Sequence, residues 1–95
     1  MKGNLNTIFG EILRDLRTRK GFTQQQLADY SGLDRAYISE LENGKLQPSL
    51  ETFLRLSYEL KVKPKDFIEE VEISKNSSKR IITFENENWL FNYYT

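Results

Sequence analysis

The sequence contains no cysteine and no histidine among its 95 residues. Without cysteine, disulfides and thiolate metal sites are excluded. Without histidine, the usual ligand of catalytic zinc and the usual general base near neutral pH are missing. We find neither a glycine-rich phosphate loop nor paired carboxylates in an evident cleft. We therefore expect no enzyme activity, no metal site and no cofactor.

Long apolar runs are missing as well. Unbroken apolar stretches have three residues or fewer, whereas a membrane span needs roughly 20. No charged-then-apolar leader is present, so we expect no secretory signal and no membrane association. The 14 basic and 14 acidic residues balance, which excludes a polybasic tail but not a nucleic-acid binder with locally placed cations. The expectation is a cytoplasmic, non-catalytic domain.

Residues 4–73 carry the pattern of five short helices, which predicts an all-α domain. Apolar residues recur at three- and four-residue spacing from Thr7 to Arg19. Further helices are predicted at residues 24–30, at 35 to 42 or 43, after the cap Ser49, and at about 65–71. Thr23 begins a capping box, and Asp34 stands where an N-cap would. The later helices are expected to bury the apolar residues Leu50, Phe53, Leu54, Leu56, Leu60, Phe67 and Ile68.

Two of these helices flank the short turn Ser31-Gly32-Leu33, which is the spacing of a helix-turn-helix. In such a unit the second helix can enter the major groove of DNA. Its polar side offers Arg35, Ala36, Ser39, Glu40 and Asn43. Arginine near a helix start suits guanine, because its planar fork matches O6 and N7. Helical geometry by itself leaves DNA binding an open question.

Longer stretches of sequence carry a resemblance to a known family. They are Gly21-Phe22-Thr23-Gln24-Gln25-Gln26-Leu27-Ala28, Ser31-Gly32-Leu33-Asp34, Tyr37-Ile38-Ser39, Glu42-Asn43-Gly44 and Pro48-Ser49-Leu50. Over about residues 6–71 the chain resembles the Cro/lambda-repressor (XRE) helix-turn-helix family. The segment 33–39 is most similar to restriction–modification controller proteins. The resemblance implies a five-helix lambda-repressor-like fold and a sequence-specific transcriptional regulator, such as a repressor, that binds double-stranded DNA.

The resemblance also implies roles for individual residues. Gln24 stands where related repressors contact a phosphate and brace the first side chain of the recognition helix. Asn43 and Lys45 match positions near the DNA backbone. Arg17 and Glu42 match a salt bridge that ties the first helix to the third. The positions that face base edges are Arg35, Ala36, Ser39 and Glu40.

Three of the expected DNA-binding residues have two interpretations. Tyr37 can pack against the second helix or offer its hydroxyl to a phosphate. Glu40 repels phosphates unless it accepts from cytosine N4 or orients Arg35. Ala36 either lets the helix approach closely or meets a thymine methyl. Since one such domain covers only a few base pairs, we expect a homodimer on an inverted-repeat operator, with half-sites roughly 34 Å apart.

Residues 74–95 differ from the rest in composition. Residues 74–78 read as a linker, and two strand-prone aromatic stretches around residues 81–84 and 89–94 predict a β-hairpin. Three roles stay open for this extension. It could pair two subunits, dock a different protein as an antitoxin does with its toxin, or cover the core of its own domain. The alternative to a DNA-binding regulator is accordingly a protein-interaction module whose DNA binding is autoregulatory.

Overall fold

The computed structural model describes residues 4–76, which form five α-helices and, within that range, no strand. The helices are α1 (Leu5–Arg19), α2 (Gln24–Ser31), α3 (Arg35–Glu42), α4 (Leu50–Glu59) and α5 (Pro64–Lys75). The predicted all-α, five-helix class is confirmed. The β-hairpin predicted for the aromatic stretches lies outside the described residues.

Short polar side chains begin two of the helices where the sequence placed them. Thr23 and Gln26 form the predicted capping box at α2, with bonds of 2.9 and 3.0 Å between each side chain and the other residue's backbone amide. Ser49 Oγ accepts from the amide of Thr52 at 3.0 Å and caps α4. Asp34 occupies the N-cap position of α3, but its side chain makes no capping hydrogen bond. These local signals explain why the predicted helix starts agree closely with the structure.

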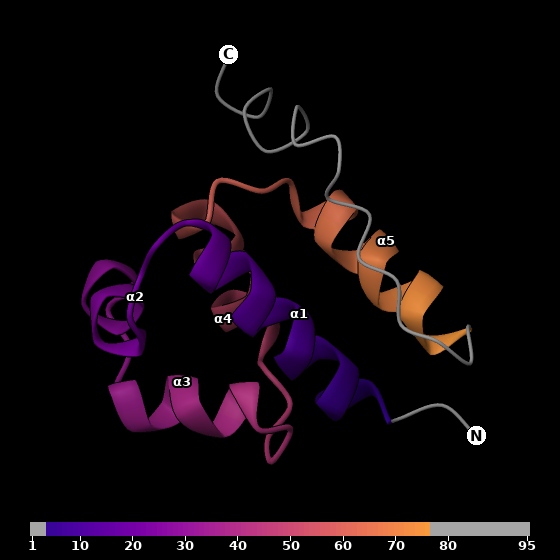
Figure 1. Cartoon of the computed structure of the whole chain (residues 1–95), viewed down its shortest axis with the longest axis horizontal. Helices are drawn as coiled ribbons and strands as arrows, with labels where there is room; N and C mark the ends of the chain where they lie inside the picture. Colours follow the sequence, from indigo (N-terminus) through magenta and orange to yellow (C-terminus); the bar gives the residue numbers. More distant parts are fainter. Residues whose placement is uncertain (1–3, 77–95) are drawn as a thin grey trace.

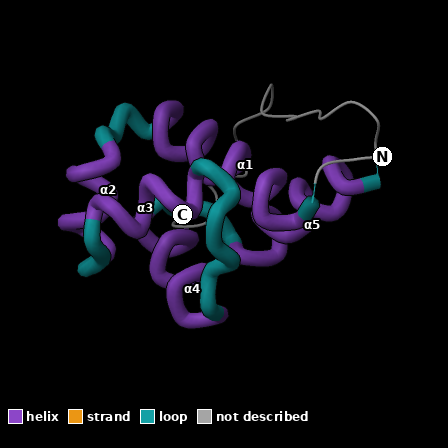
Figure 2. The backbone as a smooth tube through the Cα atoms, turned by 90° about the horizontal axis from the view of Figure 1, so that it is seen from below, coloured by secondary structure: helices purple, strands orange, loops and turns teal. Residues whose placement is uncertain are grey.

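The helices surround α1, which lies between α3 on one side and α5 on the other (Figure 1). α2 packs on α3 and on α4, and α4 packs on α5. Seen at right angles, α2 and α3 lie at the end of the molecule away from α5 (Figure 2). The turn between α2 and α3 is tight because Gly32 adopts a left-handed conformation with φ of 72°. This turn sets the angle at which α3 is presented.

The core is a single apolar cluster to which all five helices contribute. Three phenylalanine rings join α1, α4 and α5: Phe9 stacks on Phe67 with centroids 5.0 Å apart, and Phe53 meets Phe67 edge-on at 5.1 Å. The buried apolar residues are Ile8, Phe9, Ile12, Leu13, Leu16, Leu27, Ala28, Ile38, Leu41, Phe53, Leu56, Leu60, Val62, Phe67 and Val71. Burial of this cluster is the main stabilising contribution to the fold.

Three of the residues expected in the core are exposed instead. Leu50 is 73% exposed, Leu54 46% and Ile68 51%. On α4 the buried stripe passes through Phe53 and Leu56, with Ser57 and Leu60 completing it, so Leu50 and Leu54 lie on a neighbouring stripe of the helix. Ile68 follows the buried Phe67 by one residue, which turns it by about 100° away from the core. The expectation that these three residues are buried was therefore wrong.

The last helix is longer than its sequence pattern predicted. It begins at Pro64 and continues to Lys75, four residues beyond the predicted end at Val71. Pro64 is the first residue of the helix, where proline is well tolerated, and no glycine or second proline follows before Asn76. Within residues 4–76, none of the helices is long and apolar enough to cross a membrane. The division of the chain at residue 73 into a domain and an extension stays a prediction.

A close approach between α1 and α3 fixes the position of α3. A Cβ atom built on Gly10 of α1 would lie 2.3 Å from the carbonyl oxygen of Leu41 and 2.6 Å from that of Glu42. Both carbonyls belong to the last turn of α3. Only glycine allows the two backbones to lie this close. Gly10 therefore determines how deeply α3 is seated against α1.

Candidate nucleic-acid interface

One side of α3 faces the core and the other faces solvent. Ile38 and Leu41 are fully buried, whereas Arg35, Ala36 and Glu40 are exposed. Half-buried Ser39 lies one turn after Arg35. The structure thus brings the expected base-facing residues together on the outer side of a single helix. Their contacts with DNA stay predictions.

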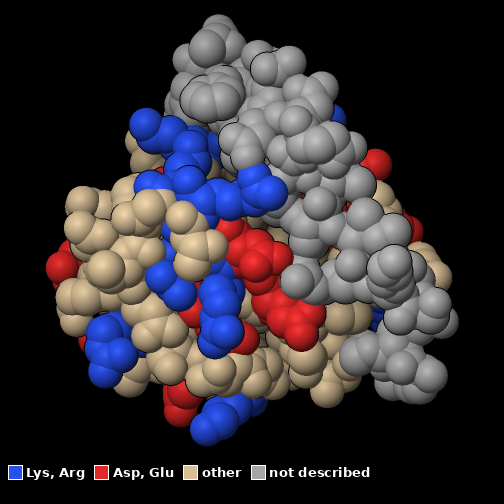
Figure 3. All heavy atoms as spheres, in the orientation of Figure 1, with Lys and Arg blue, Asp and Glu red and all other residues tan. Residues whose placement is uncertain are grey.

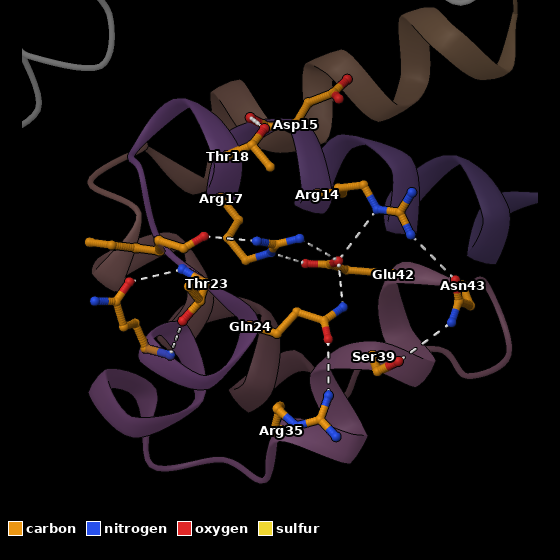
Figure 4. A network of polar contacts seen from close by, with 12 residues as sticks. Arg14, Asp15, Arg17, Thr18, Thr23, Gln24, Arg35, Ser39, Glu42 and Asn43 are labelled. Atoms are coloured by element: carbon orange, nitrogen blue, oxygen red, sulfur yellow. Dashed lines mark hydrogen bonds and ion pairs between the residues drawn. The ribbon is translucent and has the colours of Figure 1, made fainter.

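The side chain of Glu42, at the end of α3, is completely buried and lies at the centre of a polar network (Figure 4). Its Oε2 accepts from Nε of Arg17 at 2.6 Å, and its Oε1 accepts from Nη2 of the same guanidinium at 3.0 Å. Arg17 also donates to the carbonyl of Phe22 at 2.8 Å. The pair that the family resemblance implied is therefore a forked ion pair between α1 and α3. Such a pair gives both strength and geometric definition.

Gln24, at the start of α2, connects this buried pair with the surface of α3. Its Nε2 donates to Glu42 Oε1 at 3.0 Å, and its Oε1 accepts from Arg35 Nη1 at 3.4 Å. Figure 4 shows Arg35 below Gln24, with Glu42 above it. Because a carboxylate only accepts and a guanidinium only donates, the amide of Gln24 has one possible orientation. Arg35 is braced by Gln24, so the hydrogen bond that orients it comes from α2 rather than from Glu40.

A second set of polar contacts connects Glu42 with Ser39 through Arg14 and Asn43. Nε of Arg14 lies 3.5 Å from Glu42 Oε1, and Nη2 of Arg14 donates to Asn43 Oδ1 at 3.4 Å. Asn43 Nδ2 in turn donates to Ser39 Oγ at 3.5 Å. These bonds are long, and Arg14 and Asn43 are solvent-exposed, so each bond contributes less than the Arg17–Glu42 pair. Together they connect α1 with the middle of α3.

The two remaining predicted site residues lie at the edges of this surface. Tyr37 is half-buried against the core, and its hydroxyl lies 3.4 Å from Thr52 Oγ1, so its polar contact is with α4. A phenolic hydroxyl both donates and accepts, so this contact does not occupy it fully. Lys45 is exposed in the turn after α3, and its amide donates to the carbonyl of Glu40 at 3.0 Å.

The charges around this site are mixed. The network joins three guanidinium groups, on Arg14, Arg17 and Arg35, to the single carboxylate of Glu42. On the face of the molecule turned to the viewer in Figure 3, basic side chains border a smaller acidic cluster. Glu11 and Asp15 line a pocket together with Arg14 and Glu42, so the positive charge of the network is partly balanced. Attraction to a polyanion would depend on a few placed contacts rather than on overall charge.

Reasoning from the sequence missed the part played by Arg14. Arg14 precedes Arg17 by three residues and so shares that residue's face of α1. That spacing was the available signal. Gly10 was missed too, and an isolated glycine within a helical pattern indicates a packing reason of the kind found here.

The fold agrees with the results of comparison with known proteins. Residues 13–67 match the helix-turn-helix family, and the chain belongs to that family, as the resemblance to Cro and lambda repressor indicated. The control protein C.BamHI of Bacillus amyloliquefaciens is 33% identical over 81 residues, which cover 84% of this chain and 100% of C.BamHI. The chain covers only part of some longer relatives. A prophage-derived HTH-type transcriptional regulator of Bacillus subtilis is 44% identical over 50 residues, which are 53% of this chain and 46% of that protein.

Solved structures of similar proteins extend the comparison. The restriction–modification controller protein C.AhdI of Aeromonas hydrophila is 43% identical, with a TM-score of 0.62 over 64% of this chain and 92% of that one. The controller protein C.Esp1396I, solved as a tetramer in complex with its natural 35 base-pair operator, is 26% identical. It has a TM-score of 0.71 over 80% of this chain and 100% of its own. The five-helix arrangement is thus that of helix-turn-helix regulators.

Proposed function

We propose that this chain is a sequence-specific DNA-binding transcriptional regulator that binds an inverted-repeat operator as a homodimer, with α3 as its recognition helix. The observation that supports this most directly is the brace on Arg35. Gln24 Oε1 holds an exposed arginine at the start of α3, and Gln24 is itself held by the buried Glu42. An arginine held in this way reads guanine with less loss of side-chain entropy than a free one.

Similarity to C.BamHI over its full length favours a particular regulatory role. C.BamHI is a control protein, and C.AhdI and C.Esp1396I are restriction–modification controller proteins. We infer that this chain regulates the genes of a restriction–modification system. The selected operator sequence would then recur upstream of the gene for this chain or of its neighbours. This role requires a cytoplasmic protein.

An apolar face away from α2 and α3 suits the pairing of two copies. A groove of about 310 Å³ lies between α1, α4 and α5, and its lining includes Leu5, Leu50 and Ile68, all of which are exposed. Leu54 and Tyr58 extend the exposed stripe of α4 beyond Leu50. None of the residues that line this groove belongs to α2 or α3. Pairing through it leaves both recognition helices open, as an inverted repeat requires.

Selection from a randomised duplex pool, with sequencing at two salt concentrations, tests the proposal. Wild type should enrich an inverted repeat. Arg35→Ala should lose the preference for guanine at one position of each half-site, because an arginine–guanine pair contributes about 1–3 kcal/mol of discrimination. Gln24→Ala should weaken binding and broaden the same position, because it removes the brace. Lys65→Ala is the matched control, because it removes an exposed positive charge from α5, away from α2 and α3. It should leave the enriched sequence unchanged.

Enrichment of no sequence by wild type, with binding only at low salt, would contradict a sequence-specific regulator and leave non-specific attraction. A preference that survives Arg35→Ala would contradict the assignment of Arg35 as the reader. The alternative of a protein-interaction module rests on the aromatic extension, which lies outside the described residues apart from its first three. That alternative predicts insensitivity to both substitutions on α2 and α3 and sensitivity to Trp89→Ala.

A further inference from the structure

The contacts that run from Glu42 through Arg14 and Asn43 to Ser39 form one branch of the network and determine whether the Ser39 hydroxyl is available to DNA as a donor or as an acceptor. Three contacts form the branch: Arg14 to Glu42 at 3.5 Å, Arg14 to Asn43 Oδ1 at 3.4 Å, and Asn43 Nδ2 to Ser39 Oγ at 3.5 Å. Arg14 belongs to α1, whereas Asn43 caps the end of α3 one turn after Ser39. The buried end of the branch is a carboxylate and the outer end is a hydroxyl (Figure 4).

The direction of each hydrogen bond in this branch follows from its first member. A guanidinium has donors and no acceptor, so the oxygen of the Asn43 amide must face Arg14. The NH₂ group of Asn43 then faces Ser39 and donates to its oxygen. Ser39 Oγ is therefore an acceptor within the protein. Its one hydroxyl hydrogen is left for a partner elsewhere.

Two other serines within helices, Ser31 and Ser57, use that hydrogen internally. Ser31 Oγ donates to the carbonyl of Leu27 at 2.7 Å, and Ser57 Oγ donates to that of Phe53 at 2.9 Å. This bond to a carbonyl four residues earlier is the ordinary choice of a helical serine. Over residues 4–76, the side-chain hydrogen bond found for Ser39 is instead the one that it accepts from Asn43. Its hydroxyl hydrogen can therefore point outward from α3.

We propose that Arg14 and Asn43 are positioning residues that set Ser39 as a hydrogen-bond donor, so that Ser39 selects a base with an acceptor in the major groove. Guanine and adenine present N7 and thymine presents O4, whereas cytosine presents only an amino donor. Ser39 should therefore exclude cytosine at the position that it reads. This inference rests on the proposed function, because it specifies what that recognition helix reads.

The other branch has the same polarity. Glu42 only accepts, which turns the amide oxygen of Gln24 towards Arg35 and leaves the remaining donors of Arg35 for DNA. Arg14 thus makes Ser39 present a donor, and Arg35 presents donors because a guanidinium has no acceptor. The bases under these two residues should be ones rich in acceptors, which on a single strand means purines, and guanine above all.

Asn43→Asp reverses the polarity of the Ser39 branch with little change in shape. A carboxylate at this position offers oxygen to both neighbours, so the Ser39 hydroxyl donates to it and presents lone pairs to DNA. The base preference at the Ser39 position should then turn towards the amino groups of cytosine or adenine. In the same randomised-pool selection we expect the ratio of cytosine to guanine or thymine there to rise about tenfold, the scale of a single base contact.

Three further variants identify the base position that Ser39 reads and test whether Arg14 and Asn43 set its preference. Ser39→Ala identifies the base that Ser39 reads, and in its background Asn43→Asp should cause no further change in preference. Arg14→Met frees the Asn43 amide to turn over, so the exclusion of cytosine should weaken at the same position. Arg19→Met, on the same helix, is the matched control and should alter affinity at most evenly over all sequences. A thermal melt of each variant confirms that it is folded.

The outcomes separate the two proposals. If wild type enriches an inverted repeat but Asn43→Asp leaves every base preference unchanged, or if wild type enriches cytosine where Ser39→Ala acts, the inference on Ser39 is overturned and the regulator stands. If Ser39→Ala alters no position, the inference is overturned in the same way. If wild type enriches no sequence, both the inference and the proposed function are overturned.

Discussion

Replacing Gly10 with alanine has two opposing effects on stability. Alanine has the higher helix propensity, but its Cβ would clash with the backbone of α3. In an isolated helix the change is favourable by about 0.8–1.0 kcal/mol. In this protein the added Cβ would meet the carbonyl oxygen of Leu41 at 2.3 Å and that of Glu42 at 2.6 Å. An ordinary contact between carbon and a carbonyl oxygen is about 3.3 Å. α1 and α3 would therefore have to separate locally by about 1 Å.

The size of the effect follows from the nature of the atoms involved. Both obstructing atoms belong to the backbone of α3, so no side-chain rotation relieves the clash. Overpacking of a well-packed contact costs about 1–3 kcal/mol, and sometimes more. Less the gain in propensity, we expect Gly10→Ala to lower the free energy of unfolding by up to about 2 kcal/mol. For a domain of this size, a loss of about 2 kcal/mol corresponds to a fall in Tm of roughly 8–16 °C.

The assay is thermal and urea unfolding followed by circular dichroism, with DNA affinity as a second reading. Thr18→Ala, at an exposed position of the same helix, is the control and should be neutral or slightly stabilising. Because the displaced turn of α3 carries Glu42 and adjoins Asn43, Gly10→Ala should also weaken operator binding at temperatures where the variant is folded. A rise in Tm for Gly10→Ala would refute the reasoning, since it would mean that propensity outweighs the contact.

Three further perturbations have outcomes that the structure predicts. Arg17→Met and Glu42→Leu should each lower the free energy of unfolding in urea by about 3–5 kcal/mol, because each leaves one charge of the buried pair without its partner. The double variant should lose much less than the sum of the two, and additive losses would contradict a coupled pair. Lys61 has φ of 58° at the end of α4, so Lys61→Gly should raise the free energy of unfolding by about 0.5–1 kcal/mol, and a lower Tm would count against strain there. Ile68→Lys should shift the protein towards monomer in sedimentation velocity, whereas Glu69→Lys, exposed on the same helix, should not; equal behaviour of the two would remove the groove as the pairing surface.

Much of the fold could be read from the sequence because its signals are local. The capping box of Thr23 and Gln26 and the left-handed turn at Gly32 act within a few residues of the chain. They therefore place α2 and α3 wherever the rest of the chain goes. The same holds for the outer side of α3, since Arg35 and Ser39 share a face by helical spacing alone. The sequence thus determined the five helices, the helix-turn-helix and the residues presented by its second helix.

The tertiary structure decided what depends on how those helices meet. Leu54 and Ile68 are as apolar as their buried neighbours, and only the rotation of α4 and α5 against the core leaves them exposed. The contact of Gly10 with α3 and the bond from Arg14 to Asn43 join residues that are about thirty positions apart. The periodicity of a single helix cannot predict such contacts, because they depend on how two helices pack. The donor polarity of Ser39 arises in that packing, where Arg14 of α1 meets Asn43 at the end of α3.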